Sequence, residues 1–438
     1  MARLRPSIPI ADTLHKCFPD RLLREWARET GVVKRQRKVD PVTFFWTLVC
    51  GFATGGDRTL SGLRRAYHRV AKELAPSSFY KRFSVPLVAF LRRAVVHAIE
   101  QIGLDGGAAL QGPFASFRDL ILVDSSVIQV HDLLRTEFRG TRRTAPAAAK
   151  VHVVLGVRGV GRSSVQLTGE RTNDARTLIV GDWVKGHLLV FDLAYFAYPL
   201  FHAISAHGGY FLSRVKRHVN LSIAAIRTPD HESSVGLPLR EALATWTAPF
   251  VDLDVLLPVH RTPWGRYRSR DRRPFRVVAV RRTDTTTYDL YLTNVAAEQL
   301  SADGISSVYA SRWHIELLFK EWKRHYRLSD LPSAQRHIVE SLLYATILTL
   351  VASHRLAAEV RKRLGTVARR IRAQRWAALF EALAPDLLTV LVRRGRESRV
   401  VELSLRRALL AEAIDPNDRR RSLLEAIERG EHRYAHLL

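Results

Sequence analysis

Cysteine is nearly absent from this chain, which has only Cys17 and Cys50 among its 438 residues. Two cysteines are too few for a disulfide framework or for a zinc site built from thiolates. The chain also lacks a continuous apolar run of about 18 residues, the length that a membrane-spanning helix needs. Its first residues contain no uninterrupted apolar segment of the kind found in secretion signals. These absences favour a protein of the reducing cytoplasm with no membrane partner.

Acidic residues are few relative to basic ones. The chain has 42 Asp and Glu against 69 Lys and Arg, which gives a formal net charge of +27 and a pI near 10.9. An excess this large predicts a polyanionic partner, because like charges on one protein repel each other. An arginine-rich genome is the alternative explanation, since only 11 of the basic residues are lysine. With 47% hydrophobic residues, the chain can form one to three folded domains.

Both ends of the chain show the periodicity of helices. Residues 1–115 are predicted to form a helical DNA-binding region, in which Asp40 and Pro41 form a typical N-cap and first helical residue. The basic residues of this region are equally well explained as the solvated faces of bundle helices. Residues 331–438 are predicted to form a second helical region, with a buried helix at 341–356.

Short apolar and β-branched runs replace the helical pattern from about residue 118. They predict five strands, at 120–130, 150–157, 164–170, 187–196 and 209–216. A short helix is expected at 198–206, between the last two strands. Three consecutive strands followed by an alternation of strands and helices predict an α/β fold with a mixed sheet.

Residues 217–287 differ from the sheet that precedes them. They contain several prolines and arginines together with β-like runs, and this pattern predicts a β-rich insertion. Within the insertion, residues 260–276 interleave arginines with aromatic side chains, a combination suited to phosphate contacts and base stacking. Arg266 and Arg268 are therefore candidate DNA-binding residues. A solvated hairpin tip is the competing interpretation.

A polar stripe follows the helix predicted at 305–328. At about 100° per residue, Tyr309, Arg312, Glu316 and Lys323 fall on one narrow stripe about 21 Å long. The apolar face of the same helix lies directly beside this stripe. The stripe therefore borders the core, where a cleft would run. An ordinary charged helix flank is the simpler alternative.

Two aspartates follow apolar strand runs. Asp124 ends the run LILVD, and Asp192 ends LLVFD. If the two strands are neighbours, both carboxylates emerge at the same edge of the sheet. Together with Glu316 they form an all-oxygen ligand set, which suits Mg²⁺ and not zinc. Taken singly, each aspartate is also explained as the start of a turn.

The spacing Tyr309-x2-Arg312-x3-Glu316-x6-Lys323 resembles the YREK signature of the bacterial DDE insertion-sequence transposases of family four. Five further blocks are similar to that family: DSS at 124–126, FDLAYF at 191–196, FLSRVK at 211–216, YLTN at 291–294 and RWHIELLFKEWK at 312–323. The resemblance extends from about 118 to 330. One departure is the sequence Asp192-Leu-Ala-Tyr, where many relatives have Asp-Arg-Gly-Tyr.

The resemblance implies a ribonuclease-H-like core in two parts, 116–216 and 288–330, which flank the β-rich insertion at 217–287. Asp124, Asp192 and Glu316 would be its catalytic and metal-binding DDE triad. Tyr309, Arg312 and Lys323 would contact the DNA end. Lys216 and Arg214 are further candidates for lining the DNA groove, with plain strand-end charges as the alternative.

The implied activity is cut-and-paste transposition. Two Mg²⁺ ions, for which Mn²⁺ can substitute, would clamp the attacking and leaving oxygens while water and then a 3′ hydroxyl attack phosphorus. The implied partners are double-stranded DNA, as terminal inverted repeats and as target, and a second copy in a homodimer. The implied location is the bacterial cytoplasm, at the nucleoid. The alternatives are a ribonuclease-H-like nuclease without strand transfer and a catalytically inactive DNA-binding relic.

Overall fold

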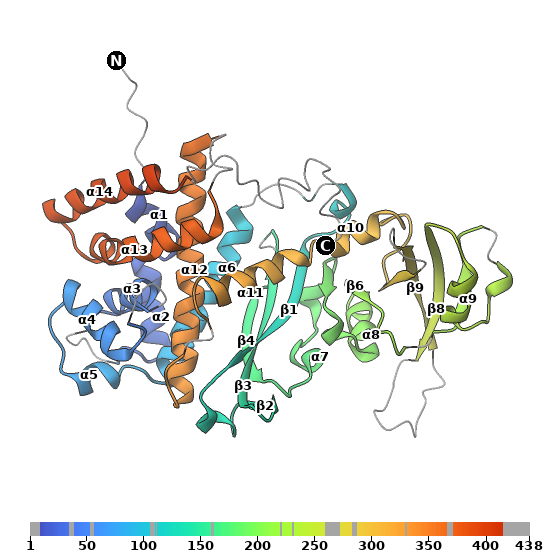
Figure 1. Ribbon diagram of the computed structural model, residues 1–438, viewed down its shortest axis with the longest axis horizontal. Helices are drawn as coiled ribbons and strands as arrows, with labels where there is room; N and C mark the ends of the chain where they lie inside the picture. Colours follow the sequence, from blue (N-terminus) through green and yellow to red (C-terminus); the bar gives the residue numbers. More distant parts are fainter. Residues whose placement is uncertain are drawn as a thin grey trace, which may run out of the picture. The chain divides into compact units, whose positions relative to one another are not determined.

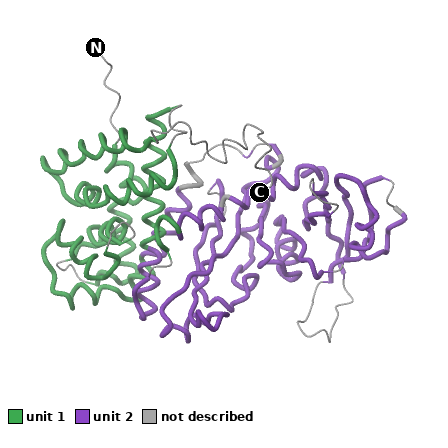
Figure 2. Tube along the Cα trace, viewed as in Figure 1, with its two compact units in different colours: residues 1–90, 324–328, 345–438 green, residues 91–323, 329–344 purple. Residues whose placement is uncertain are grey.

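A computed structural model describes most of the chain. The described residues are 9–34, 39–52, 57–105, 110, 112–158, 162–219, 221–229, 232–258, 272–282, 287–328, 331–365 and 371–414. The chain divides into two compact units (Figure 2). The first comprises residues 1–90, 324–328 and 345–438, and the second comprises 91–323 and 329–344. The first unit therefore combines both ends of the chain.

The described part of the first unit is helical (Figure 1). Its helices are α1 (Ile10–Cys17), α2 (Asp20–Glu29), α3 (Pro41–Gly51), α4 (Leu60–Val70), α5 (Pro76–Tyr80), α13 (Ala373–Val392) and α14 (Arg396–Glu412), with parts of α6 (Val85–Asp105) and α12 (Arg336–Leu364). Helix α3 begins as predicted, because the Asp40 carboxylate accepts a hydrogen bond of 2.9 Å from the backbone N–H of Thr43. The predicted helical character of both ends is confirmed for the described residues.

The two ends of the chain pack together in this unit. Helix α13 contacts α3 and α4, and the hydroxyl of Thr349 in α12 donates a 2.6 Å hydrogen bond to the carbonyl of Val49. By length and composition alone α12 could cross a membrane. However, 83% of its most apolar window is buried within the protein. Residues 341–356 thus belong to a buried core helix, as predicted.

A ten-stranded mixed sheet forms the second unit (Figure 1). Its strands are β1 (Leu120–Gln129), β2 (Arg139–Arg142), β3 (Ala145–Gly156), β4 (Ser164–Gly169), β5 (Leu188–Phe191), β6 (Tyr210–Arg214), β7 (Ile223–Ile226), β8 (Phe250–Pro258), β9 (Arg272–Arg281) and β10 (Tyr288–Thr293). The order is β2-β3-β1-β5-β6-β10-β9-β8-β7, with β4 also paired to β3. The described helices of this unit are α7 (Asp174–Thr177), α8 (Tyr198–Ala206), α9 (Leu239–Thr245), α10 (Gly304–Ala310) and α11 (Trp313–Arg324), together with the remaining parts of α6 and α12.

The strand directions confirm the expected fold class. Strands β1, β3 and β4 are antiparallel neighbours, whereas β5 and β6 run parallel to β1. An antiparallel meander continued by two parallel strands is the arrangement of a ribonuclease-H-like core. The insertion is β-rich, as predicted, and its strands extend the same sheet through β10. A helix, α9, lies within it as well.

Several boundaries differ from those expected. Strand β3 begins at Ala145, not at 150, because its alanine-rich start pairs with β1 and β2. Strand β5 ends at Phe191, since residues 193–195 form a 3₁₀ turn. The helix expected at 305–328 is broken into α10 and α11. At the break, the N–H of Arg312 bonds to the carbonyl of Tyr309, and this tighter i→i−3 bond interrupts the α-helical ladder.

A buried ion pair connects the insertion to the segment before α10. Arg276 of β9 is 4% exposed, and its guanidinium donates to the Asp252 carboxylate of β8 at 2.6 Å. The same guanidinium donates to the carbonyl of Leu300 at 2.6 Å. Loss of this partner is costly, because the Asp252 carboxylate stays buried and its other cationic contact, Arg227, lies at a longer 3.4 Å.

Replacing Arg276 by Ala should therefore lower the free energy of unfolding by about 3–5 kcal/mol. Urea denaturation measures this change. The control is Arg273→Ala on the same strand, where the exposed side chain should contribute less than about 0.5 kcal/mol. Equal losses in the two variants would contradict a stabilising role for the buried pair.

Candidate active site

Strands β1 and β5 place two aspartates side by side. Their parallel pairing runs from Leu120↔Leu188 to Val123↔Phe191, and the next residue on each strand is Asp124 or Asp192. The strand predicted at 120–130 is confirmed, and Asp124, which ends the apolar run LILVD, lies within the strand and not at its end. Strand β1 continues to Gln129 because β3 goes on pairing with it, and Asp124 lies opposite Val153. Asp192 does follow the end of β5, at the start of the 3₁₀ turn.

Glu316 comes from the first turn of α11, and the guanidinium of Arg312 links it to the sheet. Nη1 of Arg312 lies 2.6 Å from the Glu316 carboxylate and 3.4 Å from the Asp124 carboxylate. The Arg312 side chain is only 13% exposed. The structure thus brings together two of the three predicted acidic residues around one buried cation.

The charge of the third aspartate, Asp192, acts on Asp124. Burial raises the pKa of Asp124 to about 7, and the charges of Asp192 and Glu316 act in the same direction. The Ser125 N–H and Arg312 oppose this rise in pKa. Burial likewise raises the pKa of Tyr309 to about 12, with Asp192 contributing. Asp124 therefore lies in a poorly solvated position, where the negative charges of Asp192 and Glu316 reach it.

The donor set fits a hard divalent cation. Carboxylate oxygens are the ligands that Mg²⁺ and similar ions prefer, and the mutual repulsion of these groups is what a bound cation would relieve. Within the described ranges, no group of three His, Cys, Asp or Glu residues already has the spacing of a metal site. The guanidinium of Arg312 contacts both Asp124 and Glu316 and offsets their charge in the protein alone.

The remaining residues of the polar stripe lie along α10 and α11. Tyr309 is buried, and its ring contacts Tyr291 at a centroid distance of 5.2 Å and the Arg312 guanidinium at 5.4 Å. Lys323 is half-buried, and burial lowers its pKa. Lys323 is seven positions after Glu316 in the sequence. It therefore lies about two turns, or roughly 10 Å, further along the same helical face.

The other predicted DNA-binding residues have different surroundings. Arg214, at the end of β6, forms an ion pair with Asp289 of β10. Lys216 lies 5.8 Å from the Phe196 ring and lines a cavity of about 580 Å³ beside α8. Arg266 and Arg268 fall outside the described residues.

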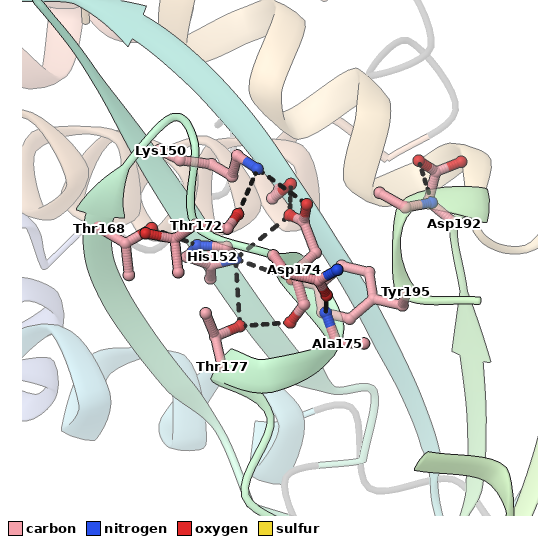
Figure 3. A network of polar contacts seen from close by, with 12 residues as sticks. Lys150, His152, Thr168, Thr172, Asp174, Ala175, Thr177, Asp192 and Tyr195 are labelled. Atoms are coloured by element: carbon pink, nitrogen blue, oxygen red, sulfur yellow. Dashed lines mark hydrogen bonds and ion pairs between the residues drawn. The ribbon is translucent and has the colours of Figure 1, made fainter. Parts of the chain in front are cut away.

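A buried polar network behind β1 is the part of the site that sequence reasoning largely missed (Figure 3). Lys150 of β3 forms a 2.8 Å ion pair with Asp174 of α7, and both side chains are about 10% exposed. His152, two residues along β3, lies 3.0 Å from the Tyr195 hydroxyl and 2.8 Å from the Thr168 hydroxyl. Burial lowers the pKa of His152 to about 4, so its imidazole is neutral at pH 7.

The network contacts the backbone around both aspartates. The Ser125 hydroxyl donates to the Asp174 carboxylate at 2.6 Å, immediately after Asp124 in β1. Tyr195 belongs to the turn that Asp192 begins, and its ring stacks on Phe191. The signal available in the sequence was the alternation in KVHVV, which puts Lys150 and His152 on the same face of β3.

Comparisons with known proteins show the family of this chain. The family model described as "Transposase DDE domain" matches residues 115–352. The transposase of insertion sequence element IS231E from Bacillus thuringiensis subsp. finitimus is 21% identical over 381 residues, covering 78% of each chain. That of IS1151 from Clostridium perfringens is 20% identical over 384 residues, covering 78% of this chain and 79% of the relative.

Among solved structures, the piggyBac transposase synaptic complex with hairpin DNA aligns with a TM-score of 0.45 and 9% identity, covering 98% of this chain and 91% of that one. The family model alone spans more than half of the chain and includes all three acidic residues. The chain belongs to the transposase DDE domain family, whose enzymes cleave DNA and transfer its strands with the help of divalent metal ions.

Proposed function

We propose that this transposase cleaves DNA at the ends of its own element and joins the freed 3′ hydroxyl groups to target DNA, with Asp124, Asp192 and Glu316 as its catalytic carboxylates. The observation that carries the proposal is that Arg312 bridges Asp124 on β1 and Glu316 on α11, while the charge of Asp192, which follows β5, acts on Asp124. No protein nucleophile is needed, because water or a DNA hydroxyl attacks the phosphorus.

Asp124, Asp192 and Glu316 would hold two Mg²⁺ ions, for which Mn²⁺ can substitute. Bound cations supply activation of the attacking oxygen and stabilisation of the leaving oxygen. The carboxylates must be ionised to hold them, and in the protein alone burial works against ionisation of Asp124. Arg312 supplies the positive charge that keeps the cluster together before cations and DNA arrive.

The polar stripe would bind the DNA end. The planar guanidinium of Arg312 matches a phosphate as well as it matches a carboxylate, so DNA and cations together can draw it away from Asp124 and Glu316. Tyr309, whose ring touches that guanidinium, would pack against the same DNA strand. The half-buried Lys323 would bind a phosphate further along the helix. Burial lowers the pKa of Lys323, and a phosphate would stabilise its charged form.

The network behind β1 would act as a positioning scaffold. Asp174 holds Ser125 beside Asp124, and His152 and Tyr195 together hold the turn that begins at Asp192. Since both aspartates are oriented by buried groups, they can approach each other despite their repulsion. These residues touch neither DNA nor cations in the proposal, and they act only through the backbone of the aspartates.

The proposed partners are double-stranded DNA in two forms, the terminal inverted repeats and the target, with a homodimer pairing the two ends. Arg214, Lys216, Arg266 and Arg268 are proposed as additional contacts with that DNA. The net charge of +27 supports such a polyanionic partner. The proposed location is the bacterial cytoplasm, at the nucleoid.

Replacing Glu316 by Gln should abolish both cleavage and joining while DNA binding persists. The amide keeps the size of the side chain but removes the charge. The expected loss is at least about 100-fold, since even outer-shell partners of a metal site change activity by 10–100-fold. The assay uses the inverted repeats that flank the reading frame, a second DNA as target, and Mg²⁺ or Mn²⁺.

The matched control is Glu321→Gln on the same helix, which should keep wild-type rates. Cleavage without joining by the wild-type protein would indicate a nuclease and refute the strand-transfer part of the proposal. Tight binding with neither reaction would indicate an inactive relic. Normal rates in the Glu316→Gln variant would remove this residue from the catalytic set.

The neutral state of His152 predicts a dependence of stability on pH. Burial lowers its pKa in the folded protein from the ordinary value of 6.5 to about 4, so the unfolded chain takes up the proton first as pH falls. The stabilisation is complete above pH 6.5 and is lost as pH falls through 4, by on the order of 3 kcal/mol. Urea denaturation at several pH values should show a smaller loss over this range for His152→Gln than for the wild type.

The exposed His207 provides the control for this measurement, because its side chain is 41% exposed. His207→Gln should retain the wild-type decline in stability between pH 6.5 and pH 4. If His152→Gln shows that same decline, burial of a neutral imidazole is not what makes the network sensitive to acid.

A further inference from the structure

Strands β2 and β3 form a hairpin at one end of the sheet (Figure 1). An arginine-lined hollow lies at this hairpin. The hollow has a volume of about 290 Å³. Five arginines line it, all of them exposed: Arg135, Arg139, Arg142, Arg143 and Arg171. Its other lining residues are Gly140, Thr141 and Pro146, so none of its lining residues is acidic.

The backbone around the hollow is closely packed. A Cβ atom on Gly140 would lie 2.2 Å from the carbonyl oxygen of Ala145, so only glycine permits this approach of β2 to β3. The Nε of Arg171 donates a 2.8 Å hydrogen bond to the carbonyl of Gly140, and the N–H of Thr141 donates to the Glu170 carboxylate at 2.8 Å. These bonds fix the hairpin against the segment after β4.

The lining of the hollow carries five guanidinium groups and no carboxylate. Glu170, beside it, accepts the hydrogen bond from the Thr141 N–H, and the charge of Arg142 helps to lower the pKa of this carboxyl. One neighbouring carboxylate offsets only part of five positive charges. Like charges held around one hollow repel each other, and bound anions would remove this repulsion.

We propose that this hollow binds the sugar-phosphate backbone of the DNA duplex engaged at the active site, as a second anchor remote from the chemistry. This inference rests on the proposed function, since it takes the cleaved phosphate to lie at Asp124. Guanidinium forks match phosphate oxygens in pairs, so five of them suit several phosphates of one polyanion better than a single small anion.

The register of the sheet gives the distance between the two sites. Along β3, six residues separate Val153, opposite Asp124, from Ala147, opposite Arg139. At about 3.3 Å per residue this is roughly 20 Å, and Arg142, two pairs further on, lies about 26 Å away. With a rise of about 3.4 Å per base pair, the hollow meets phosphates some six to eight base pairs from the cleaved bond.

The test measures DNA affinity as a function of salt for the triple variant Arg139→Ala, Arg142→Ala, Arg143→Ala. On a duplex extending 20 base pairs to each side of the cleavage position, the slope of log K against log salt should become shallower by about 2 to 3. Affinity at 0.15 M salt should fall on the order of 100-fold. On a duplex trimmed to four base pairs on each side, the variant and the wild type should bind alike.

The control removes the same charge elsewhere, through Arg396→Ala, Arg399→Ala and Arg407→Ala on exposed positions of α14. It should leave the slope close to that of the wild type. Equal slope changes in the two triple variants, or a hairpin effect that persists on the trimmed duplex, would overturn the proposal. So would a wild-type slope for the hairpin variant on the long duplex.

The cleavage assay separates this proposal from the proposed function. If the wild-type protein cleaves and joins DNA while the hairpin variant binds the long duplex normally, only the second anchor is refuted. If the wild-type protein does neither, the proposed function fails whatever the hairpin variant does, and this inference fails with it.

Discussion

The guanidinium of Arg312 is the interaction on which the arrangement of the site depends. It bridges Asp124 in the sheet and Glu316 in α11, two residues that lie 192 positions apart in the sequence. Buried carboxylates repel each other strongly where water is scarce, so a cluster of this kind needs positive charge at its centre. Arg312 provides that charge in the protein alone. In the proposed mechanism, Arg312 is the residue whose contacts would change when cations bind.

Much of the fold could be predicted from local patterns. Apolar periodicity located the helical ends and most of the core strands, and the capping pair Asp40 and Pro41 located the start of α3. Alternation and turn residues do not reveal β2 or the alanine-rich start of β3, because those segments are extended only through pairing with neighbouring strands. The break between α10 and α11 at Arg312 could not be predicted either, since the sequences on both sides of it are typical of helices.

In the candidate site, too, some residues could be predicted from local patterns and others could not. Residue type and spacing identified Asp124, Asp192, Arg312 and Glu316, because strand position and helical period bring them to one edge. The buried network was only partly foreseeable. The alternation in KVHVV puts Lys150 and His152 on one face, but His152 acquires its role from burial beside Tyr195 and Thr168, which no local pattern encodes. The arginine-lined hollow was not foreseeable either, because Arg171 reaches the β2–β3 hairpin only through its hydrogen bond to the carbonyl of Gly140.

The most direct test of the Arg312-centred site is a crystal structure of the protein bound to its element end in the presence of Mn²⁺, with the metal located by anomalous scattering. We expect manganese among the carboxylates of Asp124, Asp192 and Glu316, with the Arg312 guanidinium displaced from them onto a DNA phosphate. Manganese bound elsewhere, with Arg312 still bridging Asp124 and Glu316 in the DNA complex, would contradict the assignment of these carboxylates as the catalytic centre.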